Sequence, residues 1–156
     1  MKKAFFSFVM CIFALSMFGQ QYVDLGLPSG TLWKTQNESG YYTFDEAVNR
    51  FGSSLPTWDQ YVELYNNCRW YVTKRECTVI GPNGNYIVFP TAGYYPCWEG
   101  MPGEYIYEGV YWSSTPFGPE QAGHLWFRIE GDGMDRYEIN YEIERCTSGS
   151  VRLVMN

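Results

Sequence analysis

Two short segments early in the chain carry apolar residues at helical spacing, and each follows a capping box. In the first segment Thr43 and Glu46 form a T-x-x-E box, in which each side chain bonds the other residue's backbone N–H. Apolar residues then fall at i, i+3, i+4 and i+7: Phe44, Ala47, Val48 and Phe51. Gly52 supplies a helix end. The pattern predicts a helix that begins after Thr43 and ends at Gly52.

The second segment repeats this design. Thr57 and Gln60 form a T-x-x-Q box. An aromatic and apolar stripe with the same spacing follows, made of Trp58, Tyr61, Val62 and Tyr65. We expect the helix to close near Asn66 and Asn67, and we interpret the stripe as core packing.

Most of the remaining chain has the composition of short strands. Residues 78–80 and 86–89 flank an Asn-Gly pair, which is typical of a β-hairpin. Further strands are expected at 31–34, 110–112, 125–129, 137–141 and 151–154, with a loop-rich stretch over 91–108. Since the strands do not alternate with helices, the order predicts an α+β fold, with two short early helices flanking a twisted antiparallel sheet with long loops.

The first residues are typical of a secretory signal peptide. Lys2 and Lys3 precede an apolar run of about 15 residues that ends near Phe18. A membrane-spanning helix needs roughly 20 apolar residues, and no later segment approaches that length. We therefore expect a signal peptide over 1–20 and one exported domain over 21–156, located in a periplasm, on a cell surface or outside the cell.

The charge of the exported part argues against polyanionic partners. Without Lys2 and Lys3, nine basic residues face 17 acidic ones, for a net charge of −8. A nucleic acid or an anionic membrane surface would be repelled by this balance.

Candidate catalytic chemistry is weak in the sequence. His124 is the single histidine, and Ser113 and Ser114 lack the G-x-S-x-G context of an exposed nucleophile. Paired carboxylates could serve a glycan hydrolase, and Glu99, Glu104 and Glu108 are the candidates. We find no cofactor motif.

A metal site is not expected either. Residues 131–138 hold three carboxylates in a glycine-rich turn, but their spacing is not that of an EF-hand loop. We interpret this stretch as an acidic hairpin turn.

Aromatic residues are concentrated in the loop-rich stretch. They are Tyr94, Tyr95, Trp98, Tyr105 and Tyr107, with Glu99 among them. Exposed tyrosine and tryptophan side chains are common on recognition surfaces, although these rings could instead pack the loop onto the sheet. Our hypothesis is a non-enzymatic module that binds a glycan or an extracellular protein. The alternatives are a carboxylate-dependent glycan hydrolase and a display scaffold whose loops vary between paralogues.

Five segments carry separate motifs that follow one another along the chain: 22–33, 55–70, 81–94, 111–115 and 149–154. Together they resemble the Fibrobacter succinogenes major paralogous domain family of exported bacterial proteins. The resemblance implies a C-type-lectin-like fold in which the first and last strands pair and a long loop region presents the binding surface.

The cysteines depart from that family's pattern, because Gln36 and Leu153 stand where many relatives carry cysteine. Four cysteines remain in the exported part, and an even number in such a chain predicts up to two disulfides. The family's own disulfide is therefore not expected here. Four cysteines allow three pairings, and of these we expect Cys97 with Cys146 and Cys68 with Cys77.

Overall fold

The computed structural model describes residues 21–97, 105, 107–129 and 135–156. The predicted signal peptide over 1–20 lies outside the described residues, as do Trp98, Glu99, Glu104 and residues 131–134 of the acidic turn. In the described part of the chain, no helix has both the length and the apolar character needed to cross a membrane.

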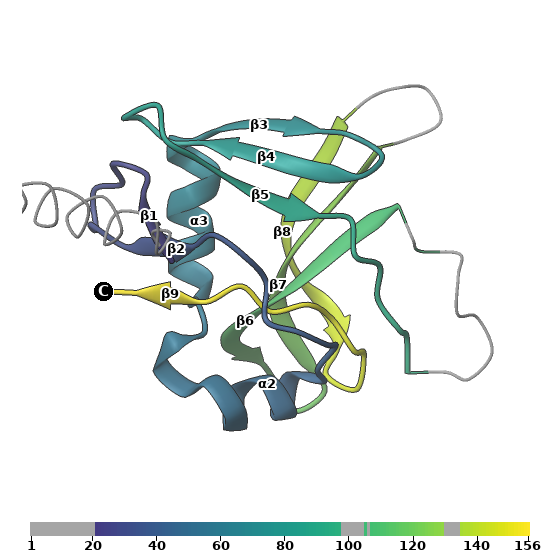
Figure 1. Cartoon of the computed structure of the whole chain (residues 1–156). Coiled ribbons are helices and arrows are strands. Elements are labelled where there is room, and N and C mark those ends of the chain that lie inside the picture. Colours follow the sequence, from purple (N-terminus) through teal and green to yellow (C-terminus); the bar gives the residue numbers. More distant parts are fainter. Residues whose placement is uncertain (1–20, 98–104, 106, 130–134) are drawn as a thin grey trace, which may run out of the picture.

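The described chain is a mixed fold of helices and antiparallel sheets, as the sequence predicted (Figure 1). The first sheet has the order β1 (Tyr22–Asp24), β2 (Leu32–Lys34) and β9 (Val154–Met155). The second contains β3 (Arg69–Val72), β4 (Glu76–Ile80) and β5 (Tyr86–Pro90), and the third contains β6 (Glu108–Phe117), β7 (Gln121–Ile129) and β8 (Asp135–Glu144). The helices are α2 (Phe44–Phe51) and α3 (Trp58–Asn67), with a 3₁₀ turn, η1 (Gly52–Ser54), between them.

Both capping boxes form as predicted. The Thr43 side chain accepts from the Glu46 backbone N–H, and the Glu46 carboxylate accepts from the Thr43 backbone N–H at 2.8 Å. Thr57 and Gln60 make the equivalent pair at the start of α3. Gly52 ends α2 with a φ of 51°, a backbone conformation that favours glycine.

The chain end differs from two expectations. The last strand, β9, pairs with β2, while β1 pairs with the other edge of β2, so the first and last strands are not neighbours. The strand expected at 151–154 is reduced to Val154–Met155. The backbone N–H groups of residues 34, 38 and 42 donate to the carbonyls of residues 153, 151 and 149, respectively. The donors are spaced four residues apart, whereas the acceptors are spaced two residues apart. This mismatch prevents a regular ladder.

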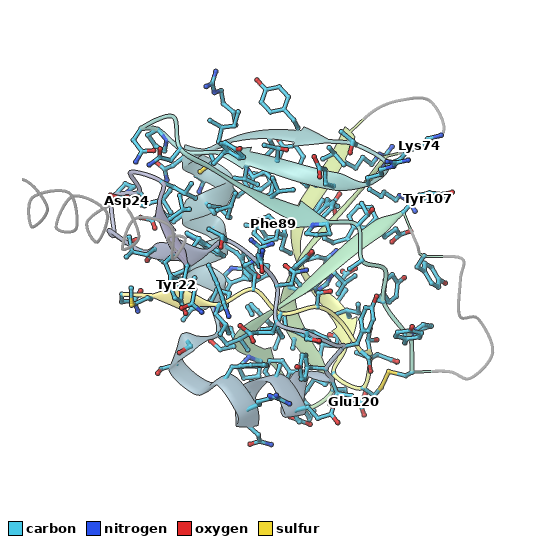
Figure 2. The ribbon with its side chains drawn as sticks, viewed as in Figure 1. Tyr22, Asp24, Lys74, Phe89, Tyr107 and Glu120 are labelled. Atoms are coloured by element: carbon cyan, nitrogen blue, oxygen red, sulfur yellow. A yellow bond between two sulfur atoms is a disulfide. The ribbon has the colours of Figure 1, made fainter. Side chains whose placement is uncertain are left out.

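The strands β6–β8 carry apolar side chains on both faces. One face contributes Tyr111, Leu125 and Phe127 to a core shared with α3 and the second sheet, and Figure 2 places Phe89 of that core near the centre of the molecule. The other face contributes Trp112 and Ala122 to a smaller core shared with α2. This smaller core also includes Phe44, Ala47 and Leu55. Because side chains alternate along a strand, each of these strands feeds both cores.

Candidate functional site

The third sheet carries a row of polar and aromatic side chains on the face that α2 partly covers. In the strand register, Val110 of β6, Trp126 of β7 and Glu138 of β8 lie side by side. The neighbouring row contains His124 and Asn140. All five side chains therefore belong to one face of β6–β8.

A groove of about 270 Å³ lies over these rows. Tyr94, from the loop before β6, lines it together with residues from all three strands: Val110, His124, Trp126, Glu138, Asn140 and Glu142. The groove thus combines aromatic rings, one imidazole, an amide and two carboxylates, as in sites where polar groups orient a ligand between apolar walls.

Tyr94 is held in place by a ring contact within its loop and by backbone hydrogen bonds of its two neighbours. Its ring packs against that of Tyr105, with centroids 4.4 Å apart and an angle of 33° between the planes. On either side of it, Gly93 N–H donates to the Glu108 carbonyl at 2.8 Å, and Tyr95 exchanges two backbone hydrogen bonds with Ser148. Burial, followed by the nearby Glu108 carboxylate, raises the pKa of Tyr94, so its phenol stays neutral at physiological pH.

Trp126 is also fixed by its neighbours. Its indole N–H donates to the Glu108 carboxylate at 2.7 Å, and the Arg128 guanidinium lies 5.0 Å from its ring centre. Arg128 also contacts Glu108 at 3.4 Å, so the three side chains form one cluster. A ring held in this way is ordered before any ligand arrives, which reduces the entropic cost of binding.

His124 lines the groove with only 4 % of its surface exposed. Burial lowers its pKa to about 4, so the imidazole is neutral near pH 7. The Ser113 hydroxyl is buried as well and donates to the Gly123 carbonyl at 2.8 Å. That hydroxyl proton is therefore already engaged with the backbone.

The predicted ligand-binding residues divide into three groups. Tyr94 lines the groove, and Tyr105 packs behind it. Tyr95 does not line the groove, and its ring meets that of Tyr41 edge to face, with centroids 4.9 Å apart. Tyr107 is 55 % exposed and lies at the periphery of the molecule (Figure 2). Trp98 and Glu99 lie outside the described residues.

The sequence reasoning missed the strand residues of the groove. Trp126 and His124 alternate with buried Leu125 and Phe127 along β7, and Glu138, Asn140 and Glu142 alternate along β8. This period-two pattern was the available signal, because polar residues at every second position of a strand mark a face that is not fully buried.

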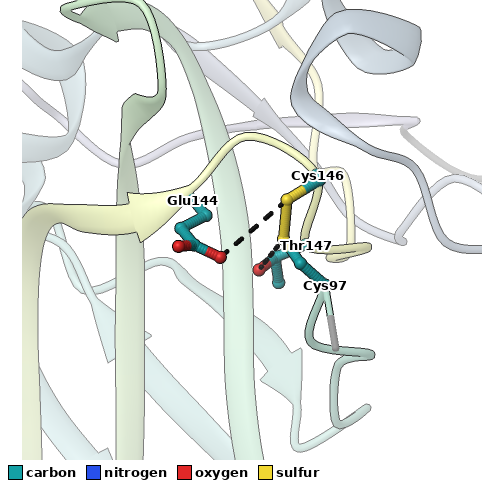
Figure 3. Close-up of a disulfide and its surroundings, with 4 residues drawn as sticks. All are labelled: Cys97, Glu144, Cys146 and Thr147. Carbon is teal, nitrogen blue, oxygen red and sulfur yellow. Dashed lines mark hydrogen bonds between the residues drawn. A yellow bond between two sulfur atoms is a disulfide. The ribbon is translucent and has the colours of Figure 1, made fainter. Parts of the chain in front are cut away.

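A disulfide joins Cys97 to Cys146 and ties the aromatic loop to the chain just after β8, as expected (Figure 3). The Thr147 hydroxyl lies 3.7 Å from the Cys97 sulfur, and the Glu144 carboxylate lies 3.9 Å from the Cys146 sulfur. Ligand atoms of Cys97, Glu144 and Cys146 are within 4.8 Å of one another. Metal binding by thiolates would require the disulfide to be reduced first.

The second expected disulfide, Cys68 with Cys77, is not formed, and both residues keep their thiols. In the ladder of β3 and β4, Cys77 lies opposite Val72, whereas Cys68 precedes Arg69, which lies opposite Ile80. Four strand residues therefore separate the two cysteines along the ladder, about 13 Å at 3.3 Å per residue. A disulfide requires Cα atoms within about 7 Å.

Comparison of the chain with protein-family models, with curated proteins and with solved structures finds no match.

Proposed function

We propose that this protein is an exported recognition module that binds a glycan in the groove over β6–β8. The observation that carries this proposal is the meeting of Tyr94, from the aromatic loop, with Trp126 and the polar residues of β7 and β8 in one groove. The proposal refines the sequence-based hypothesis, because it moves the contacts from the loop alone to the loop and the sheet together.

The composition of the groove suits a sugar. The pyranose ring presents C–H groups that pack on aromatic faces, and its hydroxyls need hydrogen-bonding partners such as carboxylates and amides. Glu138, Glu142 and Asn140 supply these partners beside Trp126. A volume of about 270 Å³ is at the small end for ligand sites, so we expect one short part of a longer glycan to enter.

We also propose that the domain has a C-type-lectin-like fold and belongs to the family that its sequence resembles. Support comes from the order of the elements: an N-terminal hairpin, two capped helices, and a C-terminal strand that returns to that hairpin. The loop before β6 then contributes Tyr94 to the proposed site, consistent with a binding surface built from the long loop region. Export rests on the leader-like sequence of residues 1–20.

The experiment is a glycan array probed with protein purified, with its disulfide intact, after expression of the full chain. Tyr94→Ala and Trp126→Ala should each weaken binding about tenfold, because a ring at the centre of a contact contributes more than 1 kcal/mol. Tyr94→Phe keeps the ring and should bind nearly normally. Tyr86→Ala is the matched control, since Tyr86 is 61 % exposed on β5 and does not line the groove.

The array also separates the competing hypotheses. Binding that survives both alanine variants would show that the glycan binds elsewhere, and an array with no binding at all would favour a protein ligand or a display scaffold. Shortened products after incubation with a bound oligosaccharide would favour the hydrolase. For that case Glu108→Gln is the informative variant, because this carboxylate touches Trp126 and Arg128 at the edge of the groove.

A further inference from the structure

The groove presents mainly hydrogen-bond acceptors. Glu138 and Glu142 offer carboxylate oxygens, which in the ionised form can accept hydrogen bonds but cannot donate them. Asn140 can both donate and accept. The indole N–H of Trp126, the obvious donor, already donates to Glu108. A ligand that donates hydrogen bonds therefore suits this groove better than one that accepts them.

His124 adds an acceptor to the groove lining. Its Nδ1 lies 3.5 Å from the Ala122 carbonyl, an acceptor, which favours the neutral tautomer with the proton on Nδ1. Nε2 then carries a lone pair, and it has no hydrogen-bond partner among the described residues. Since the ring lines the groove, Nε2 can accept a hydrogen bond from a ligand donor.

The charges around the groove also favour a ligand that donates hydrogen bonds. Glu138 and Glu142 bring two negative charges to its lining, and no arginine or lysine stands among the described residues that line it. Arg128 contacts the Glu108 carboxylate, outside the lining. Arg136 lies opposite Arg128 in the ladder of β7 and β8, beyond the row that holds Trp126 and Glu138. The lining itself is therefore anionic.

We propose that the ligand carries a primary ammonium group, as in a glycan of hexosamine units whose amines are not acetylated. The ammonium group would lie between Glu138 and Glu142, while a hydroxyl or N–H of the same sugar donates to Nε2 of His124. An ammonium group offers three donors and a positive charge, which match acceptors and carboxylates together. This inference rests on the proposed glycan-binding function and names the class of glycan.

The test compares three soluble oligosaccharides of equal length: glucosamine oligomers, N-acetylglucosamine oligomers and glucose oligomers. Calorimetry at mildly acidic pH keeps the sugar amines protonated. We expect the glucosamine oligomer to bind at least about fivefold more tightly than the other two, with the difference shrinking at high salt because exposed charge pairs are screened. Glu138→Gln and Glu142→Gln should each remove about two- to fivefold of this preference.

Two control variants make the test specific. Glu76→Gln removes one negative charge at an exposed position of β4, away from the groove, and should leave the preference unchanged. His124→Phe should weaken binding of the glucosamine oligomer by removing the Nε2 acceptor. Because His124 is buried, this variant could fold poorly, and the glutamate variants then carry the test alone.

The outcomes distinguish this inference from the function on which it rests. Equal binding of all three oligosaccharides, lost in Trp126→Ala, would overturn the ammonium proposal and leave glycan recognition standing. Binding of a lysine oligomer with no binding of the glucosamine oligomer would overturn the glycan assignment and point to a basic peptide. No binding of any oligosaccharide, together with an empty glycan array, would overturn both proposals.

Discussion

Arg152 is a fully buried charge that no carboxylate contacts among the described residues. Its guanidinium donates to the carbonyls of Lys34, Thr35 and Val88, and twice to the side-chain oxygen of Asn37. It also lies 4.7 Å from the centre of the Phe89 ring. These contacts tie the β2 region and β5 to the C-terminal segment, so we expect stability to depend strongly on this side chain.

The perturbation is Arg152→Met, which keeps most of the length and removes every donor. Four acceptor oxygens lose a buried partner, at about 1–3 kcal/mol each. Removing the charge also removes its desolvation cost, which is several kcal/mol in proteins. The difference leaves a net destabilisation of about 3–5 kcal/mol. Arg152→Lys keeps the charge but offers three donors from a single atom, so it should recover only part of this loss.

The assay is urea unfolding followed by tryptophan fluorescence, with the midpoint and the slope fitted separately. Arg152→Met should lower the midpoint at an unchanged slope. Arg69→Met is the matched control, because Arg69 is exposed on β3, and it should change the unfolding free energy by less than about 0.5 kcal/mol. An Arg152→Met protein as stable as the native one would refute the reasoning, because desolvation of the charge would then offset all of its hydrogen bonds.

Three further predictions concern other parts of the fold. A methyl group added by Gly109→Ala would lie 2.2 Å from the ring of Phe127, so we expect about 1–3 kcal/mol of destabilisation in thermal unfolding, and an unchanged melting temperature would contradict the close packing. Because burial lowers the pKa of His124 to about 4, the unfolded chain takes up a proton between pH 6.5 and about 4 and the folded chain does not. The free energy of unfolding should therefore fall by up to about 3 kcal/mol as the pH is lowered through this range. His124→Asn should remove that part of the pH dependence, and equal slopes in both proteins would disprove it. Replacing Cys97 and Cys146 together by serine opens a link across 49 residues and should cost about 2–4 kcal/mol, measured against the oxidised parent in urea.

Local chemistry predicted some elements well. The helices follow from capping boxes and a 3.6-residue period, and the β4–β5 hairpin follows from its Asn-Gly turn, because each of these signals lies within a few residues. The sequence reasoning did not find β1 and β3, which are only three and four residues long and depend on partners elsewhere in the chain. The expected strands in the third sheet were too short, since cross-strand pairing extends β6 and β8 to ten residues each.

The candidate site was predicted only in part for a related reason. Tyr94 was found because aromatic residues are dense in its loop. Trp126 and Glu138 are far apart in sequence and become neighbours only through the register of β7 and β8. A strand residue that belongs to a site has the same local pattern as one that faces solvent, so the pairing of strands had to be known first.

The lengths of the elements explain why the groove lies where it does. A ten-residue strand such as β8 is about 33 Å long, whereas the eight residues of α2 span about 12 Å. The helix can therefore cover only part of the face of β6–β8, near Trp112 and Ala122. The rest must be covered by irregular chain or stay open, and a covering loop has to satisfy its backbone polar groups. The loop that carries Tyr94 satisfies backbone groups through its hydrogen bonds to Ser148, and the disulfide at Cys97 anchors it further. The groove is the part of the sheet that this loop borders without covering.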